Sequence, residues 1–319
     1  LLYQSHGSPI HNGYNHPLLL PLNPTADTPP PKTVLFRIDR LRNSGSGFST
    51  VWVGSEESLS WRYQIRQLLQ VQLPFMGSAA FLAVGAFAFA VWVGRRRELL
   101  YLLFFAISAL AFFRTLHYYA GGSYIPISDE WFEWMTVSSL LWLVILIHLF
   151  LQRLHQQPSV WLTRIAVTLA VACSVSTLPH LWSKIVSLYL FTPLLNLAVL
   201  PVAVLIFTVN LRKSLGTQQT EGRLVAVWTV FALALTSYDG LLQNNLVSPE
   251  SVYMSPYAII SLFFVFSYIM FQLYTGAFAE VGRLNRGLAL RLKEREAELE
   301  QSYQRLRASE NQHMLSAER

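Results

Sequence analysis

The chain has 319 residues, of which 53% are hydrophobic and only 13% are charged. Soluble domains carry roughly 25% charged residues, so this composition predicts a membrane protein. The formal net charge of +6 does not indicate nucleic-acid binding, because the arginines lie at the ends of apolar runs and along the last segment, where membrane anchoring explains them. One cysteine, Cys173, excludes an intramolecular disulfide.

The first 73 residues are predicted to belong to a β domain outside the membrane. Residues 33–38 and 49–54 alternate apolar side chains, and the loop RNSGSG between them predicts a hairpin. A lone hairpin is marginally stable in water, so we expect this segment to be the end of a domain whose beginning lies outside the chain. Ser55, followed by two glutamates, predicts the start of a helix that leads to the membrane.

Residues 74–280 are predicted to form a bundle of seven transmembrane helices. A hydrocarbon core needs about 20 apolar residues, and seven runs approach or exceed that length: 75–94, 99–119, 131–151, 165–182, 185–211, 224–242 and 254–279. The fourth run is the shortest, and the fifth contains Pro193 and Pro201, so we expect it to kink. The fold class predicted is therefore a mainly α membrane protein.

The loops predict the orientation of this bundle. Those after the first, third and fifth runs contain eight basic residues, including the membrane-anchoring triplet Arg95, Arg96 and Arg97. The loops after the second, fourth and sixth runs contain Lys184 alone. Because basic loops stay in the cytoplasm, the N-terminal segment is predicted to lie outside and the C-terminal segment inside.

Residues 281–319 are predicted to form a cytoplasmic coiled-coil helix that continues from the seventh span. Two glutamates interrupt the second apolar stripe, so we expect a weak parallel coil, and hence a homodimer. A weak coil suits a switch between two packings that differ by a few kcal/mol. The alternative is a single solvated helix. The coil positions are Leu292, Leu299, Tyr303 and Leu306.

Ionisable and aromatic residues gather near the predicted outer ends of spans two and six. Charges in a bilayer are costly, and they usually pair or face a cavity. One interpretation is an outward-facing ligand pocket in which Arg114 pairs with Asp239. The alternative is a structural ion pair, or separate side chains that reach the membrane surface. The candidate pocket residues are Arg114, His117, Tyr118, Tyr119, Tyr238 and Asp239.

No catalytic residue, metal ligand or cofactor is assigned to this chain. His148 and His155 are seven residues apart and could hold haem or a metal, but no third ligand has matching spacing, so we favour chance placement. The sequence has no H-E-x-x-H, G-x-S-x-G or phosphate-binding glycine loop. The small residues along the first span, from Gly77 through Gly85 to Ala88, indicate helix packing.

The order of these features resembles a known receptor family. TVLFRID and STVWVGSEESL precede the first span, GRRRELLYLLFF forms the first inner loop, and FFRTLHYY ends the second span. This pattern resembles the bacterial seven-transmembrane receptors with diverse intracellular signalling modules. The resemblance implies an inner-membrane receptor whose outer part is a jelly-roll-like, carbohydrate-binding-type sensor, of which this chain would hold the end. Its ligand would be a small molecule or carbohydrate.

The tail SYQRLRASENQHMLSAER is similar to the segment before the dimerisation helix of nitrate-sensor-type histidine kinases. There, a pair like Glu318–Arg319 is followed within a few residues by the phosphoacceptor histidine. His313 does not match that histidine, because Met314 follows it where the family has an acidic residue. The phosphoacceptor and an ATP- and magnesium-binding kinase domain would then follow this chain.

The resemblance therefore implies the sensory region of a two-component histidine kinase that acts on a response regulator. The alternative is the same receptor with a diguanylate cyclase or another output. A membrane transporter is less expected, because the ionisable groups lie near span ends rather than at the membrane midplane.

Overall fold

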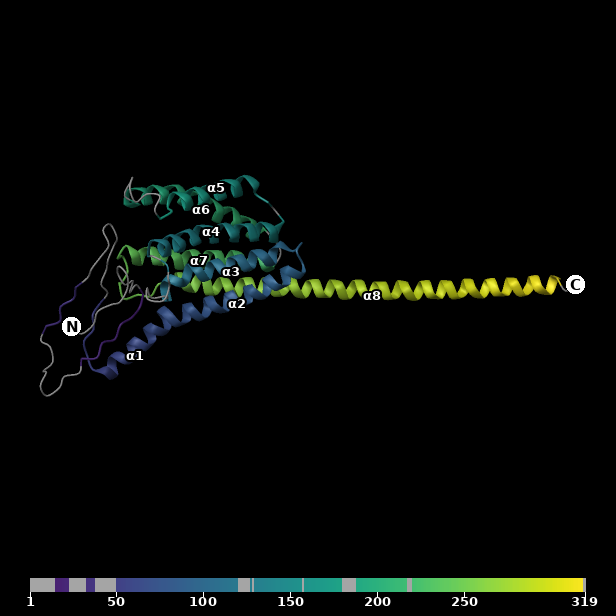
Figure 1. Cartoon of the computed structure of the whole chain (residues 1–319), viewed down its shortest axis with the longest axis horizontal. Helices are drawn as coiled ribbons and strands as arrows, with labels where there is room; N and C mark the ends of the chain where they lie inside the picture. The colour runs from purple at the N-terminus through teal and green to yellow at the C-terminus, as the bar shows by residue number, and fades with distance from the viewer. Residues whose placement is uncertain are drawn as a thin grey trace. The chain divides into compact units, whose positions relative to one another are not determined.

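The computed structural model describes residues 15–22, 33–37, 50–119, 127, 129–156, 158–179, 188–216 and 220–317, and within these ranges it is mainly helical, without a strand (Figure 1). A π-helical turn, η1 (Leu68–Gln72), joins the first two helices. The α-helices are α1 (Glu56–Gln67), α2 (Leu73–Gly94), α3 (Leu99–Tyr119), α4 (Asp129–His155), α5 (Val160–Ser176), α6 (Leu188–Gly216), α7 (Thr220–Gln243) and α8 (Ser255–Ala317).

The structure confirms the helical membrane character. In the described part of the chain, five helical segments are long and apolar enough to cross a membrane: Glu56–Gly94, Leu99–Tyr119, Trp134–His155, Thr220–Leu242 and Ser255–Arg307. A sixth, α5, is apolar but has 17 residues. Each of the seven predicted runs overlaps a helix, while a full set of seven crossings remains a prediction.

The predicted hairpin is not found in the described residues. Residues 33–37 and 50–55 lack strand pairing, and the connecting residues 38–49 lie outside the described ranges. Leu35 is 91% exposed and Val53 is 80% exposed. Alternating side chains favour a strand only where a neighbouring strand and a buried face complete it, and the described part of residues 1–55 supplies neither.

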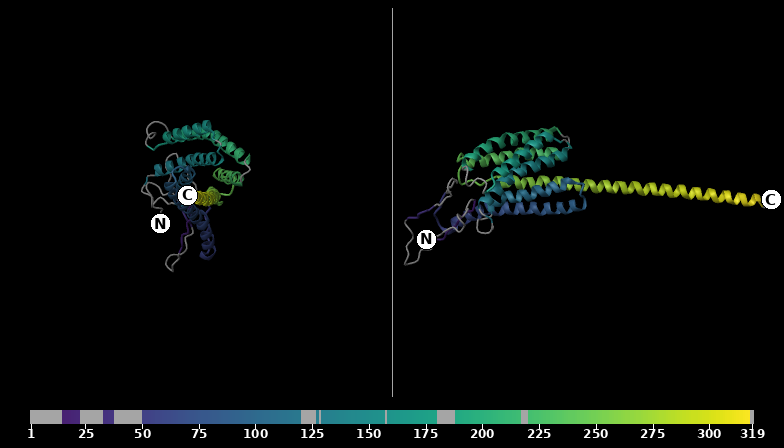
Figure 2. Two further views of the ribbon diagram at one scale, coloured as in Figure 1. Left: turned by 90° about the vertical axis from the view of Figure 1, so that its right-hand side faces the viewer. Right: turned by 45° about the horizontal axis from the view of Figure 1, so that its top comes forward.

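The chain divides into two units, residues 1–267 and 268–319. In the first unit the helices from α2 to α7 lie side by side (Figures 1 and 2). Neighbours in sequence pack together, α2 on α3, α3 on α4, α4 on α5 and α6 on α7, and α4 also contacts α6. The α2–α3 turn holds the anchoring arginines, of which Arg96 stacks on the Trp92 ring at 4.5 Å.

The first part of α8, up to Ser267, packs inside this bundle. Phe266 stacks on Phe150 of α4 with ring centroids 4.6 Å apart, and both rings are fully buried. Trp228 of α7 donates a hydrogen bond to Ser261 at 3.1 Å. Aromatic pairs contribute about 0.5–1.5 kcal/mol beyond their buried area, so the beginning of α8 is held by α4 and α7 together.

Small residues allow α2 to approach its neighbours closely. A Cβ added at Gly85 would collide with Ser108 of α3, and one added at Gly77 would collide with Ile260 of α8. Between helices in lipid, close packing replaces the hydrophobic effect as the source of association. The predicted packing face is confirmed at Gly77, Gly85 and the buried Ala88, while Val84 on the same stripe is 37% exposed.

The second unit, residues 268–319, continues α8 to Ala317, and α8 as a whole has 63 residues. The structure thus confirms that the last span and the charged tail form one helix. The four predicted coil positions are 61–71% exposed in the single chain: Leu292, Leu299, Tyr303 and Leu306. An apolar stripe left open in this way fits a coiled-coil partner, and dimerisation itself remains a prediction.

Candidate functional site

Asp239, near the end of α7, binds the beginning of α8. Its carboxylate accepts hydrogen bonds from the backbone N–H of Met254 at 2.6 Å and of Ser255 at 2.7 Å, and from the Ser255 hydroxyl. The first N–H groups of a helix have no partner within the helix, and a carboxylate there also interacts favourably with the helix dipole. With 4% of its surface exposed, Asp239 acts as the N-terminal cap of α8.

Arg114 and Asp239, which one interpretation of the sequence pairs, have different partners in the structure. Within the described residues no ion pair joins the two, and the Arg114 side chain instead lies 3.2 Å from Nδ1 of His117, one turn further along α3. The physical reason is competition, because the Asp239 carboxylate is already satisfied by two backbone amides and a hydroxyl. Arg114 therefore keeps a local partner on its own helix.

The candidate tyrosines of α3 lie at the same end of the bundle as this cap. Tyr118 is 3% exposed and interacts electrostatically with both Arg114 and Asp239. The centroid of its ring lies 6.1 Å from that of Tyr253. Tyr119 shares a hydrogen bond with Ser78 of α2 at 3.0 Å. The predicted residues thus meet at one end of the bundle, where α3 and α7 end and α8 begins; we call it the cap end.

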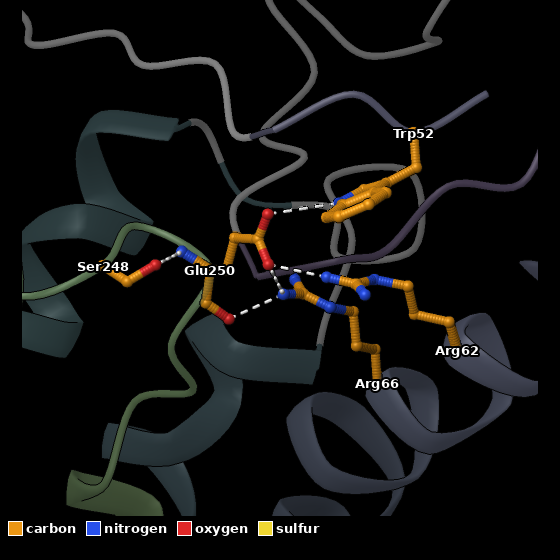
Figure 3. Close-up of polar contacts among 5 residues, drawn as sticks. All are labelled: Trp52, Arg62, Arg66, Ser248 and Glu250. Atoms are coloured by element: carbon orange, nitrogen blue, oxygen red, sulfur yellow. Dashed lines mark hydrogen bonds and ion pairs between the residues drawn. The ribbon is translucent and has the colours of Figure 1, made fainter.

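Glu250, in the α7–α8 loop (residues 244–254), forms a polar cluster at the cap end (Figure 3). Its carboxylate pairs with Nη2 of Arg62 at 2.6 Å and accepts a hydrogen bond from Nε1 of Trp52 at 3.2 Å. Arg66 donates to the Glu250 carbonyl oxygen at 2.6 Å. The Arg62 guanidinium also lies over the Trp52 ring at 3.9 Å. We name these four residues the Glu250 latch.

The latch connects two distant parts of the sequence. Trp52 precedes α1, and the two arginines stand on one face of α1 because four residues separate them. Glu250 lies five residues before α8 begins. The latch therefore connects α1 and the segment before it to the short loop that ends at the Asp239 cap.

A second connection comes from the π-helical turn before α2. Proline lacks an N–H, so Pro74 cannot donate to the carbonyl groups one turn earlier, those of Leu69 and Gln70. The Asn15 side chain donates to the Gln70 carbonyl oxygen at 2.7 Å. The adjacent Leu69 carbonyl accepts a hydrogen bond from the Tyr257 hydroxyl of α8 at 2.8 Å. The π-helical turn thus supplies two backbone carbonyl oxygens, one of which binds Asn15 of the N-terminal segment and the other Tyr257 of α8.

An open groove of about 370 Å³ lies beside the latch. Leu69 of η1 and Tyr238 of α7 form part of its lining, and the α7–α8 loop and α8 supply the rest. The lining residues are Leu69, Tyr238, Ser251, Val252, Met254 and Tyr257. Of the predicted pocket residues, Tyr238 alone is in this lining, next to the buried Asp239.

The histidines of α4 bind protein groups. His148 is fully buried, with Nδ1 2.9 Å from the Asn210 side-chain oxygen and Nε2 2.5 Å from the Gln152 amide. His155 contacts Ser214 at 3.1 Å. Both ring nitrogens of His148 therefore have protein partners, which leaves this side chain no free nitrogen for haem or a metal.

Sequence reasoning placed the aromatic and charged residues of α3 and α7 near one another but missed the Glu250 latch. Its contacts join residues 184 to 198 positions apart, beyond the reach of any local pattern. The available signal was the spacing of Arg62 and Arg66, which places two cations on one face of the short helix α1. Such a pair is compatible with an anion from elsewhere in the fold, but it does not identify which one.

No protein-family model matches the chain, and comparisons with curated proteins and with solved structures found no similar protein.

Proposed function

We propose that this chain is the sensory transmembrane region of a bacterial inner-membrane receptor that passes an external signal to a cytoplasmic output. The Glu250 latch is the observation that carries the proposal most directly. It joins the segment before the membrane to the loop that starts the last helix. A helix bundle that serves only as a membrane anchor does not need a link between its outer segment and its last helix, whereas a receptor that transmits a signal does.

In this proposal the cap end faces outward and the coil of α8 lies in the cytoplasm. The basic residues of the α2–α3 turn, together with those in the loops after the third and fifth predicted spans, support this orientation through the positive-inside rule. A small molecule or carbohydrate bound outside would move the segment that contains Trp52 and, through the latch, the α7–α8 loop. Because Asp239 holds the first amides of α8, the loop and the helix move together.

The coil is the output side of this mechanism. Residues 268–317 continue α8 without a break, so a shift or rotation of its first turns reaches Leu292, Leu299 and Leu306. In a homodimer these leucines would pack against their counterparts, and a small change in register would select between two packings. The resemblance of the tail to nitrate-sensor-type kinases favours a histidine kinase that phosphorylates a response regulator, with ATP and magnesium bound by the kinase domain.

Heptad phase tests this mechanism in the full-length receptor. Inserting four residues after Gly287 changes the phase of the coil, while inserting seven residues keeps it. We expect Glu250→Ala to change autophosphorylation in isolated membranes. The four-residue insertion should abolish that change, and the seven-residue insertion should retain it. If the four-residue insertion leaves the effect of Glu250→Ala intact, α8 does not transmit through a phased coil.

The identity of the output has its own test in the gene sequence after Arg319. A histidine followed by an acidic residue, and then an ATP-binding domain, supports the kinase. A Gly-Gly-acidic-acidic-Phe motif would contradict the kinase and identify a diguanylate cyclase, while leaving the transmission mechanism intact.

A further inference from the structure

The groove beside the Glu250 latch has the dimensions of a small-ligand site. Its volume of about 370 Å³ lies near the lower end of the ~300–1,000 Å³ typical of ligand pockets. It is large enough for one narrow apolar chain. The side chains of Leu69, Val252 and Met254, with the rings of two tyrosines, make its lining predominantly apolar.

Two arginines, which are not themselves lining residues, lie near the Ser251 end of this groove. Arg66 lies one helical turn from Leu69, and its guanidinium donates to the Glu250 carbonyl, one peptide away from the lining residue Ser251. Arg62 stands one turn further out. Among the described residues, the two guanidinium groups face one carboxylate, that of Glu250, at 2.6 and 3.9 Å.

Arg62 also has unused hydrogen-bonding capacity. Its Nε atom is buried and, among the described residues, has no hydrogen-bond partner. A buried unsatisfied donor is unfavourable, and it costs more on a charged group. An anion at this end of the groove can compete with Glu250 for the two arginines, because guanidinium groups are well suited to bind carboxylates.

We propose that the groove binds a single-chain anionic amphiphile, of the fatty-acid class, with its carboxylate at Arg66 and Arg62 and its chain against Leu69, Val252 and Met254. The volume of the groove fits one chain, its apolar lining fits the hydrocarbon part of the ligand, and the arginines fit a negatively charged head group. A membrane protein meets such molecules at the surface of its own bilayer, where chain and carboxylate partition together.

This inference extends the proposed function, because the carboxylate would compete with Glu250 for the arginines of the latch. Occupancy would weaken the contact between α1 and the α7–α8 loop, and the amphiphile would become a signal that the receptor reads. Binding and signalling are separable. If the ligand binds without changing the output of the receptor, the binding site is supported and only its role in signalling is refuted.

The test measures saturable binding of radiolabelled decanoate to the protein in phosphatidylcholine nanodiscs, with empty nanodiscs as the background. We expect decanoate to bind at least tenfold more tightly than 1-decanol, which has the same chain without the charge. Val252→Trp fills the groove and should abolish binding, and Arg66→Gln should weaken it about tenfold. Val227→Trp, on a 69% exposed position of α7, is the matched control and should bind as the wild type does.

Each failure overturns the proposal in a defined way. Absence of saturable binding to the wild type would show that the groove takes no such ligand, and equal binding of decanol would remove the role of the arginines. Unchanged binding by Val252→Trp or by Arg66→Gln would place the ligand elsewhere. Loss of decanoate binding when phosphatidylglycerol is added to the nanodiscs would assign the groove to bilayer lipid. Because the decanol comparison and Arg66→Gln leave the groove unfilled, a misfolded Val252→Trp protein would not prevent a decision.

Discussion

Replacing Glu250 with alanine should break the connection between α1 and the α7–α8 loop at its carboxylate. The substitution removes the Arg62 ion pair at 2.6 Å and the Trp52 hydrogen bond at 3.2 Å. The bond from Arg66 to the Glu250 carbonyl remains possible, because it uses the backbone. Hydrogen bonds to charged groups contribute about 1.5–3 kcal/mol when buried.

Partial exposure reduces that magnitude. The side chains of Arg62 and Glu250 retain 38% and 27% of their accessible surface, so water screens part of the attraction. Fully exposed pairs contribute only about 0.2–1 kcal/mol. The latch lies between these limits, and we expect Glu250→Ala to lower the free energy of unfolding by about 1–2 kcal/mol. The coupling between Glu250 and Arg62 should account for about 1 kcal/mol of this.

A double-mutant cycle measures the coupling. Glu250→Ala, Arg62→Ala and the double variant are unfolded in mixed micelles by titration with dodecyl sulfate and followed by far-ultraviolet circular dichroism. The matched control is the pair Glu280 and Arg283, 3.1 Å apart, with side chains 59% and 76% exposed, for which we expect a clearly smaller coupling. A Glu250–Arg62 coupling no larger than that of the control would refute the structural role of the latch.

Three further outcomes are expected. Gly85→Ala should destabilise the bundle by about 1–3 kcal/mol through collision with Ser108, while Gly240→Ala, whose Cβ would meet open space, should be neutral or stabilising in the same unfolding titration. Asp239→Asn should speed hydrogen exchange of the amides at the start of α8, because the charge-assisted cap is lost; unchanged exchange would contradict the cap. In a Cys173→Ser background, Leu299→Cys should form disulfide-linked dimers, whereas Gln301→Cys, on the opposite face of the helix, should not. Equal cross-linking at both positions would argue against the coil.

The helical framework could be predicted from the sequence because its signals are local. A run of about 20 apolar residues bounded by charges indicates a span wherever it occurs. The continuous path from the last span into the charged tail was also visible, since no proline interrupts it. The end of the fourth run was less accurate: helix α5 ends at Ser176, whereas the predicted run continues to 182.

The failures share one physical cause, which is that a local pattern does not identify its distant partner. Alternating residues near Val53 predicted a strand, yet the described chain offers no neighbouring strand. Asp239 and Arg114 were placed together at the correct end of the bundle, but the backbone amides of Met254 and Ser255 compete better for the carboxylate. Glu250 is a single charge in a loop and matches no local sequence pattern. Only the fold brings Arg62 and Arg66 to it.

The proposed transmission through α8 is tested most directly by a distance measurement across the dimer. Spin labels at position 299 of a Cys173→Ser, Leu299→Cys protein in nanodiscs report the separation of the two coils by pulsed electron resonance. If the latch controls α8, Glu250→Ala should shift the distance distribution by on the order of 2 Å or more, the scale of helix displacements in signalling. Superimposable distributions with the latch intact and broken would contradict the proposed transmission.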